Sequence, residues 1–205
     1  MRIAVVNEFS ARDKNPHILE ALAATGAKIL NIGMPDGPAW RDLTYVHTGL
    51  IAALALETGC ADFVVGGCGT GQGFMISAMQ YPGVFCGFVT NALDAWLFSR
   101  INAGNCVSLA LNKGYGWAGD IELRYIFEKL FCGEDGQGYP ANRREAQQVS
   151  RNLLAAAGRA GHRDFLDILP ALDPAILGPV LDHAPFMECV EKHAGAGALR
   201  ELILR

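Results

Sequence analysis

The sequence predicts an α/β fold built on a doubly wound, five-stranded parallel sheet, followed by a helical extension. Two observations support this class. Short apolar runs rich in β-branched residues alternate five times with longer segments of helical periodicity, as expected when each strand is followed by a crossover helix. After Gly133 the composition changes, and only helical patterns continue to Arg205. The first part therefore forms the sheet, and the second part adds helices alone.

The expected strands of the sheet are short and apolar, and each precedes a helical segment. They span residues 3–6, 28–32, 63–65, 84–89 and 106–111. The first expected helix begins at Pro16, and the third begins near Phe74. The second, fourth and fifth expected helices cover 44–58, 92–101 and 117–131. Gly26 and Gly59 follow the first two helices, where a glycine commonly ends a helix. The connections are short, as in a compact α/β unit.

The helical extension begins after a glycine-rich link at residues 134–140. Helices are expected over 143–157, 162–169, 173–181, 185–193 and 197–204, and Asp173-Pro174 and Ala184-Pro185 are typical helix starts. We divide the chain into a sheet domain, 1–138, and an extension, 139–205.

Composition excludes several classes of function. The chain has 205 residues and a net charge of −4, and it has no long basic run, so nucleic acid is not an expected partner. No apolar run approaches the roughly 18 residues of a membrane span, and the N-terminus is typical of a strand and not of a signal peptide. Six cysteines without a C-x-x-C pair and five scattered histidines indicate no metal site. We expect a cytoplasmic protein without membrane contacts.

A glycine-rich loop after the third strand is the strongest functional signal. Residues 66–73 read Gly-Gly-Cys-Gly-Thr-Gly-Gln-Gly, so that Cys68 lies where the strand ends and a helix follows. Glycines let the backbone approach a ligand closely, and amides at a helix start can hold negative charge. A thiol in this setting can act as a base or a nucleophile. We therefore expect an anion hole with Cys68 at its edge.

A nucleotide-binding loop and a purely structural turn are alternative interpretations of this loop. Its glycine spacing is not the dinucleotide fingerprint, and no Lys-Ser/Thr pair follows as in a nucleotide P-loop. A structural alternative is a tight turn around an inert buried cysteine. However, ligands of parallel sheets bind outside the carboxyl ends of the strands. Polar residues follow other expected strands at that edge, namely Asn7-Glu8, Thr90-Asn91 and Asn112-Lys113. This convergence favours the functional interpretation.

Three segments of the chain resemble type B ribose-5-phosphate isomerase and the related galactose-6-phosphate isomerase subunits. They are residues 68–73, 82–84 and 102–107. The likeness covers about the first 145 residues, and the extension resembles a tail found on some members only. The resemblance implies a Rossmann-like fold without a metal or organic cofactor. It also implies a small-molecule sugar phosphate as substrate, and a homodimer or larger assembly with its sites at the subunit interface.

The resemblance further implies a reaction and its residues. The reaction would interconvert an aldose and a ketose through a cis-enediolate, with Cys68 as the base that moves a proton between C1 and C2. Thr70 belongs to the same motif, and preorganised amides would hold the enediolate oxygen. Those amides come from Gly69, Gly71 and Gly73. The other expected substrate-binding residues are Glu8, Asn91, Asn102, Asn105, Arg143 and Arg144.

Three positions depart from the family pattern. Glu8-Phe9 stands where the family has Asp-His, Ile101 replaces the histidine credited with ring opening, and Thr90-Asn91 replaces a His or Ser/Glu pair. A linear substrate needs no ring opening, and a tetrose 4-phosphate cannot close a ring through its phosphorylated oxygen. We therefore expect a short or open-chain sugar phosphate. His47 could otherwise supply the proton, although a lone histidine is more often structural.

Two other functions stay open at this stage. The missing histidines favour a sugar-phosphate-binding or regulatory homologue that keeps the fold and has lost turnover. A thiol-nucleophile enzyme such as an acyl transferase is a third hypothesis, and it needs a histidine folded close to Cys68. The intact loop around Cys68 favours an aldose–ketose isomerase, an intramolecular oxidoreductase.

Overall fold

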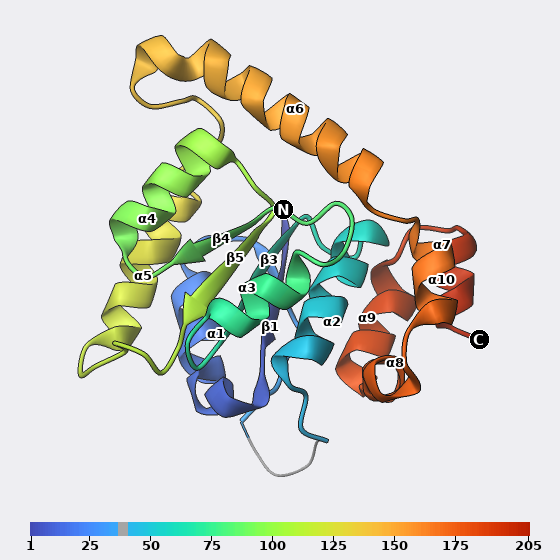
Figure 1. The fold of residues 1–205 in the computed structure, drawn as a ribbon. Helices are drawn as coiled ribbons and strands as arrows, with labels where there is room; N and C mark the ends of the chain where they lie inside the picture. The colour runs from blue at the N-terminus through green and yellow to red at the C-terminus, as the bar shows by residue number, and fades with distance from the viewer. Residues whose placement is uncertain (37–40) are drawn as a thin grey trace.

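The computed structural model describes residues 1–36 and 41–205 and contains a five-stranded parallel sheet with helices on both faces (Figure 1). The strands are β1 (Arg2–Asn7), β2 (Lys28–Asn31), β3 (Phe63–Cys68), β4 (Cys86–Val89) and β5 (Cys106–Ala110). Their order across the sheet is β2-β1-β3-β5-β4, and every neighbouring pair is parallel. The predicted fold class is confirmed.

Helices of the sheet domain cover the two faces in two groups. They are α1 (Asn15–Ala23), α2 (Tyr45–Glu57), α3 (Gln72–Ala78), α4 (Ala92–Leu97) and α5 (Gly119–Leu130). Successive strand residues point to opposite faces. Ile3 and Val5 are therefore buried in the cluster that contains α1 and α5, whereas Ala4 and Val6 are buried in the cluster of α2 and α3. The sheet is thus covered on both sides, as a parallel sheet requires.

Two element boundaries differ from the sequence prediction. The helix expected over 92–101 changes at Phe98 into a π-helical turn, Phe98–Asn102, which ends at Ala103 with a φ of 45°. Strand β4 begins at Cys86 and not at residue 84, because Asn105 binds the preceding backbone. Its Oδ1 accepts the Phe85 N–H at 2.9 Å, and its Nδ2 donates to the Gly83 carbonyl at 2.8 Å. These groups are therefore satisfied by a side chain instead of a strand.

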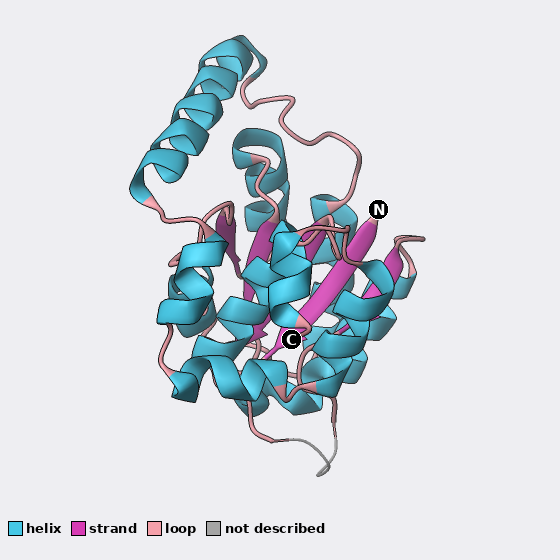
Figure 2. Cartoon of the chain, turned by 90° about the vertical axis from the view of Figure 1, so that its right-hand side faces the viewer, coloured by secondary structure: helices cyan, strands magenta, loops and turns pink. Residues whose placement is uncertain are grey.

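The extension consists of α6 (Arg144–Gly161), α7 (Phe165–Ile168), α8 (Pro174–Leu181), α9 (Ala184–His193) and α10 (Ala198–Ile203). Short 3₁₀ turns cover Phe9–Lys14, Ala141–Arg143 and Leu169–Ala171. Val180, Phe186 and Val190 are buried in the same apolar cluster as α2. Helix α6 has no buried residue and lies beyond the amino ends of the strands (Figures 1 and 2). The division at residues 138 and 139 stays a prediction.

His183 connects the extension to the sheet. The residue is 4% exposed, and its Nε2 lies 3.1 Å from the carbonyl oxygen of Ile32, just beyond β2. Burial lowers the pKa of this imidazole below its ordinary value, against the smaller opposing effect of its backbone hydrogen bonds. The unfolded chain therefore binds more protons than the folded chain at acid pH. The resulting stability is present above the unfolded-state pKa of 6.5 and is lost as the pH falls below it.

We expect the midpoint of urea unfolding to decrease from about pH 7 to about pH 5, and to decrease less in His183→Gln. Glutamine can still donate a hydrogen bond to Ile32 but cannot take up a proton. His162→Gln, which changes a histidine at the end of α6, is the matched control. If the unfolding midpoint decreases by the same amount in native protein and in His183→Gln, the protonation of His183 does not cause the decrease.

Candidate active site

The candidate site lies at the carboxyl ends of β1 and β3. The chain leaves β1 toward β2 on one side and leaves β3 toward β4 on the other, so that a crevice opens between the two central strands. Asn7 is opposite Gly67 in the register, and the Glu8 N–H donates to the Gly67 carbonyl at 3.1 Å. Glu8 and Cys68 are therefore the first residues past this last pairing, at the position where ligands of such sheets bind.

Cys68 is the last residue of β3 and is 5% exposed. Its carbonyl accepts hydrogen bonds from the amides of Leu111 at 3.0 Å and Gly71 at 3.3 Å, which fix the end of the strand to β5 and to the loop. The Sγ atom lies 3.9 Å from Thr70 Oγ1. The thiol and the Thr70 hydroxyl, both singled out from the sequence, are therefore next to each other at the start of the loop.

The loop depends on its glycines for both conformation and space. Gly71 has a φ of 75°, and a Cβ there would lie 2.5 Å from the Phe88 ring. A Cβ on Gly73 would lie 2.9 Å from Cγ of Tyr45. Real Cβ atoms do not approach so closely, and side chains rarely adopt the left-handed conformation. The spacing read from the sequence thus reflects a backbone packed tightly against two aromatic rings.

The three loop amides expected to form the anion hole differ in their partners. The Gly69 N–H donates to Ser10 Oγ at 3.2 Å, and the Gly71 N–H donates to the Cys68 carbonyl at 3.3 Å. The Gly73 N–H, in the first turn of α3, has no hydrogen-bond partner among residues 1–36 and 41–205. In this state Gly73 alone of the three offers an uncommitted amide.

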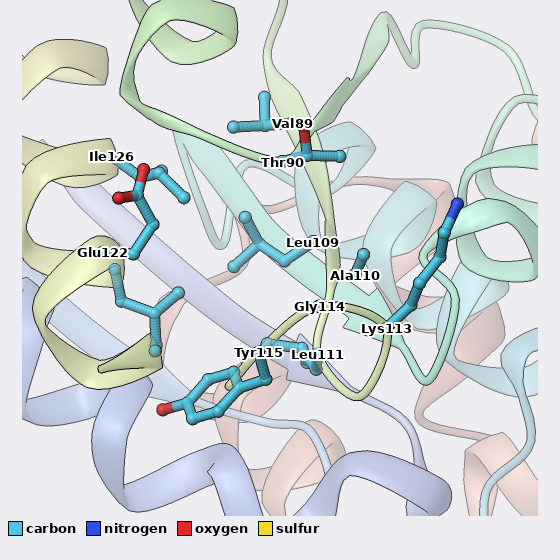
Figure 3. Close-up of a pocket in the computed structure, with 12 residues that line it drawn as sticks. Val89, Thr90, Leu109, Ala110, Leu111, Lys113, Gly114, Tyr115, Glu122 and Ile126 are labelled. Carbon is cyan, nitrogen blue, oxygen red and sulfur yellow. The ribbon is translucent and has the colours of Figure 1, made fainter. Parts of the chain in front are cut away.

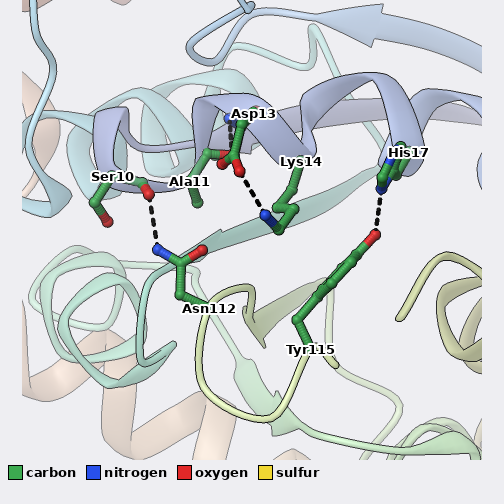
Figure 4. A network of polar contacts seen from close by, with 8 residues as sticks. Ser10, Ala11, Asp13, Lys14, His17, Asn112 and Tyr115 are labelled. Atoms are coloured by element: carbon green, nitrogen blue, oxygen red, sulfur yellow. Dashed lines mark hydrogen bonds and ion pairs between the residues drawn. The ribbon is translucent and has the colours of Figure 1, made fainter. Parts of the chain in front are cut away.

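Glu8 is connected to this loop through Ser10. Glu8 is 4% exposed, and its Oε1 accepts a hydrogen bond from the Ser10 hydroxyl. Asn112 Nδ2 donates to the Ser10 carbonyl at 2.8 Å (Figure 4), and the Asn112 and Lys113 amides donate to the Gly69 carbonyl at 3.0 and 2.9 Å. The ends of β1, β3 and β5 therefore form one hydrogen-bonded unit.

Ser10 is the residue of this unit that the sequence analysis missed. It follows Glu8 by two residues, inside a 3₁₀ turn, and no sequence motif marks it. The sequence marks Asn112 and Lys113 only as polar residues at a strand end. The signal that could have found Ser10 is the run of polar residues after β1, since hydroxyl groups near a buried carboxylate commonly satisfy it.

The remaining predicted residues do not lie beside Cys68 in the same chain. Asn91 is at the carboxyl edge, but it caps α4: its Oδ1 accepts the Asp94 N–H at 3.0 Å. Asn102 and Asn105 precede β5, whose far end, Ala110, is opposite Cys68. The rise of β5 separates these ends by about 13 Å. Arg143 and Arg144 are exposed at the start of α6, beyond the amino ends of the strands (Figure 1).

Two of the cavities lie at opposite ends of the sheet. One, about 400 Å³, lies between α6 and the π-helical turn and is lined by Ile101, Asn102, Arg151 and Leu154, among others. The smaller, about 50 Å³, lies between β4, β5 and α5 and is lined by Thr90, Leu109, Tyr115 and Glu122, among others (Figure 3). It has room for a few water molecules. Ile101 and Asn102 thus share a cavity at the end of the sheet opposite Cys68.

His47 has a structural role. Its Nδ1 accepts the Thr44 N–H at 3.0 Å, and its Nε2 lies 3.1 Å from the Ala175 carbonyl in α8. Both ring nitrogens are therefore used in starting α2 and in attaching the extension to it. His47 is not available as the substitute for the missing ring-opening histidine in this state.

The charged groups beside the loop are mostly paired. Lys14 Nζ lies 2.5 Å from Asp13 Oδ2 and 5.0 Å from the centre of the Tyr115 ring. Burial, with Asp120 and Asp13 nearby, raises the pKa of Tyr115 to about 12, so that its phenol stays neutral and contacts His17 Nδ1 at 2.5 Å (Figure 4). Lys113 is exposed, forms no ion pair within the described residues, and points away from Tyr115 (Figure 3). Lys113 is thus one cation with which this edge can meet an anion.

No helix among the described residues has the length and hydrophobicity to cross a bilayer. Within those residues, no three His, Cys, Asp or Glu side chains gather closely enough to hold a metal ion. The groups that the edge itself offers are a thiol, two hydroxyls, a buried carboxylate, backbone amides and the Lys113 ammonium.

A parallel α/β sheet with a thiol and a glycine loop at its switch point defines a site for a small polar substrate. The family model for ribose/galactose isomerases matches residues 3–143. Since this match covers more than half of the chain, the chain belongs to the ribose/galactose isomerase family and is a sugar isomerase. A comparison with curated proteins gave no match.

Solved structures extend this likeness to the whole chain. Ribose-5-phosphate isomerase from Vibrio parahaemolyticus is 39% identical, with a TM-score of 0.94, and the match covers 99% of this chain and 97% of the other. A 4-deoxy-L-threo-5-hexosulose-uronate ketol-isomerase, solved with tartrate, is 37% identical with a TM-score of 0.96 and the same coverage. Type B ribose 5-phosphate isomerase from Leishmania infantum shares the fold at 20% identity, with a TM-score of 0.64 over 78% of this chain and 98% of its own. The helical extension is thus common to this chain and the first two proteins.

Proposed function

We propose that this protein interconverts the aldose and ketose forms of a short or open-chain sugar phosphate through a cis-enediolate, with Cys68 as the proton-transfer base. The observation that carries the proposal is the position of Cys68: it ends β3 at the switch point of the sheet, beside Thr70 and the glycine loop. Membership of a sugar isomerase family gives the reaction type. The family's reaction needs a base at this point and a place for negative charge nearby.

The roles of the groups at this edge follow from their chemistry. As a thiolate, Cys68 takes the proton from C2 of the aldose, and the electrons of that bond form the C1–C2 double bond while charge moves to O1. The uncommitted Gly73 amide and the Lys113 ammonium are available to that charge. Gly69 and Gly71 can contribute only if the substrate displaces the present partners of their amides. Thr70 stays within reach of the thiol and holds its orientation.

The substrate class is argued from what the site lacks. Ile101 cannot donate a proton to a ring oxygen, and Phe9 is an exposed aromatic side chain where the family has an imidazole. His47 is held by Thr44 and Ala175. An open-chain substrate removes the need for a ring-opening acid, and a phosphate supplies the negative charge that the family pattern implies.

A second substrate class is a sugar acid. The 4-deoxy-L-threo-5-hexosulose-uronate ketol-isomerase matches this chain over nearly its whole length at 37% identity, and its named substrate carries a carboxylate where a sugar phosphate carries a phosphate. The reaction at C1 and C2 would be the same, with Cys68 in the same role. The two classes differ in the anion that is bound, a phosphate or a carboxylate.

The test is a substrate panel in deuterated water. D-Erythrose 4-phosphate, D-ribose 5-phosphate and 4-deoxy-L-threo-5-hexosulose uronate are incubated with native protein. NMR follows the product, deuterium at C1 of the ketose, and deuterium at C2 of the recovered aldose. Product together with exchange for at least one of the three supports an enediolate isomerase. The absence of both product and deuterium exchange with all three substrates would contradict the proposal.

We further propose a homodimer or larger assembly in which one copy supplies Cys68 and another supplies Asn102 with Arg143 and Arg144. Asn102, Arg143 and Arg144 are exposed and lie at the end of the sheet opposite Cys68. A single chain therefore cannot bring them and Cys68 to one substrate. Helix α6, which has no buried residue, carries Leu153 and Leu154 at 66% and 59% exposure. A second copy would cover them.

We expect light scattering to give at least twice the chain mass of 22.0 kDa. Mixing inactive Cys68→Ala with inactive Arg143→Ala/Arg144→Ala, after unfolding and refolding together, should restore about a quarter of native activity, because half of the dimers are mixed and have one intact site. A monomer at micromolar concentration, or no recovery on mixing, would show that each chain holds a complete site or that the arginines lie outside it.

A further inference from the structure

We propose that Ser10 carries the oxygen-bound proton of the isomerisation, passing it between the substrate oxygens and the buried Glu8 carboxylate. This inference rests on the proposed function, because it concerns the second proton that any aldose–ketose isomerisation must move. Cys68 transfers a proton between C1 and C2, but a proton must also leave O2 and reach O1.

The geometry supports a role of Ser10 between carboxylate and substrate. Glu8 is 4% exposed, whereas Ser10 is an exposed residue of the 3₁₀ turn that follows β1. The Ser10 hydroxyl donates to Glu8 Oε1 and accepts the Gly69 N–H at 3.2 Å. The Gly69 nitrogen belongs to the peptide that begins at Cys68. Ser10 Oγ therefore lies within about 6 Å of the Cys68 Cα, with the Glu8 carboxylate behind it.

The position of Ser10 is fixed by groups that do not take part in proton transfer. Asn112 Nδ2 donates to the Ser10 carbonyl at 2.8 Å (Figure 4), and the Asn112 amide donates to the Gly69 carbonyl at 3.0 Å. The same loop therefore holds both partners of the hydrogen bond between Ser10 and Gly69. A substrate oxygen that takes the Gly69 amide would replace Ser10 Oγ as its acceptor and would lie next to that hydroxyl.

The proton balance closes with these groups alone. The Cys68 thiolate first takes the C2 proton, which leaves a thiol and an enediolate with its charge on O1. The O2 proton then passes to Ser10 Oγ as the Ser10 proton passes to Glu8, the C2 carbonyl forms, and C1 takes the proton back from the thiol. The neutral Glu8 finally returns its proton through Ser10 to O1. Cys68, Ser10 and Glu8 end in their starting states, and the aldose has become the ketose.

The experiment separates the carbon step from the oxygen step. The member of the panel above that native protein converts fastest is incubated in deuterated water with native protein, Ser10→Ala, Ser10→Thr and Cys68→Ala. NMR gives two rates for each: deuterium entering C2 of the recovered aldose, and ketose formed. Without the relay, the enediolate returns to the aldose more often than it goes forward. In Ser10→Ala the ratio of exchange to conversion should therefore rise about tenfold or more, whereas Ser10→Thr, which keeps a hydroxyl, should stay near the native ratio.

Thr25→Ala is the matched control, because it removes a hydroxyl that donates to the Leu22 carbonyl at 2.7 Å just after α1, away from both the loop and α6. Equal decreases of exchange and conversion in Ser10→Ala, with the native ratio kept, would overturn the relay and leave the isomerase assignment intact. Persisting exchange in Cys68→Ala would instead contradict Cys68 as the base. If Ser10→Ala does not fold, Glu8→Gln gives the same readout, since an amide cannot store the proton, and an unchanged ratio there overturns the relay.

Discussion

Replacing Cys68 by alanine should lower aldose–ketose turnover by about 10²- to 10⁴-fold, the usual contribution of a positioned acid or base. Deuterium exchange at C2 should fall by the same factor, because the thiol is the group that takes this proton. KM should change little, since the bonds that the loop makes through the Cys68 carbonyl are backbone bonds and remain in the variant. The measurement is initial rates over a range of substrate concentrations, together with exchange by NMR.

Cys132→Ala serves as the matched control, because Cys132 is an exposed thiol outside the loop. The far-UV spectrum and unfolding midpoint of Cys68→Ala should stay near native values, since Cys68 is a small side chain at a strand end and not a large core residue. Full activity in Cys68→Ala would refute the thiol as base. A covalent adduct of native Cys68 with an acyl donor, trapped by mass spectrometry, would instead favour the thiol-nucleophile hypothesis.

Much of this site could be predicted from the sequence because its parts are local. Residues 66–73 form a continuous strand, turn and helix start, so glycine spacing and apolar periodicity were enough to place Cys68 at a carboxyl end. The conformation of Gly71, with a φ of 75°, explains why that spacing is so specific. The alternation of strands and helices likewise predicted the parallel sheet, since each strand of such a sheet needs a crossover.

Other features depend on contacts between distant segments and could not be read locally. The order β2-β1-β3-β5-β4 places β5 between β3 and β4, and it therefore brings Asn112 next to Ser10, 102 residues away. The roles of Asn105 and His47 also could not be predicted from the local sequence. Asn105 binds the backbone before β4, and His47 binds the Ala175 carbonyl in an extension 128 residues further on. A polar side chain at a strand end or a helix start serves structure or chemistry depending on such partners.

The position of Asn102 illustrates a different limit. The sequence placed it in a motif shared with the family, and the structure places it in the cavity beneath α6, at the end of the sheet opposite Cys68. Cys68 and Asn102, which both belong to the family pattern, thus lie at opposite ends of the sheet. A single sequence gives no signal of whether a second copy joins those ends, because the complementary surface belongs to the assembly and not to the chain.

Ribose 5-phosphate should be a poor substrate, with kcat/KM at least about tenfold below that of D-erythrose 4-phosphate. The pentose spends most of its time as a closed ring, and opening that ring requires a group that protonates the ring oxygen and takes the anomeric proton. Ile101 can do neither, and it lines the cavity beneath α6. Without that group the enzyme must wait for spontaneous ring opening, whereas a linear aldose can react with Cys68 at once.

Ile101→His tests this reasoning in the opposite direction. If Ile101 of one copy faces the substrate held by Cys68 of another, a histidine there should raise turnover of ribose 5-phosphate several-fold and leave erythrose 4-phosphate nearly unchanged, because only the pentose needs ring opening. Ile76→His adds an imidazole at an exposed isoleucine of α3 and is the matched control. Equal native rates with pentose and tetrose would show that another group opens the ring. A gain in Ile101→His for both substrates alike would show that the histidine acts on a step common to them, such as the proton transfer between oxygens.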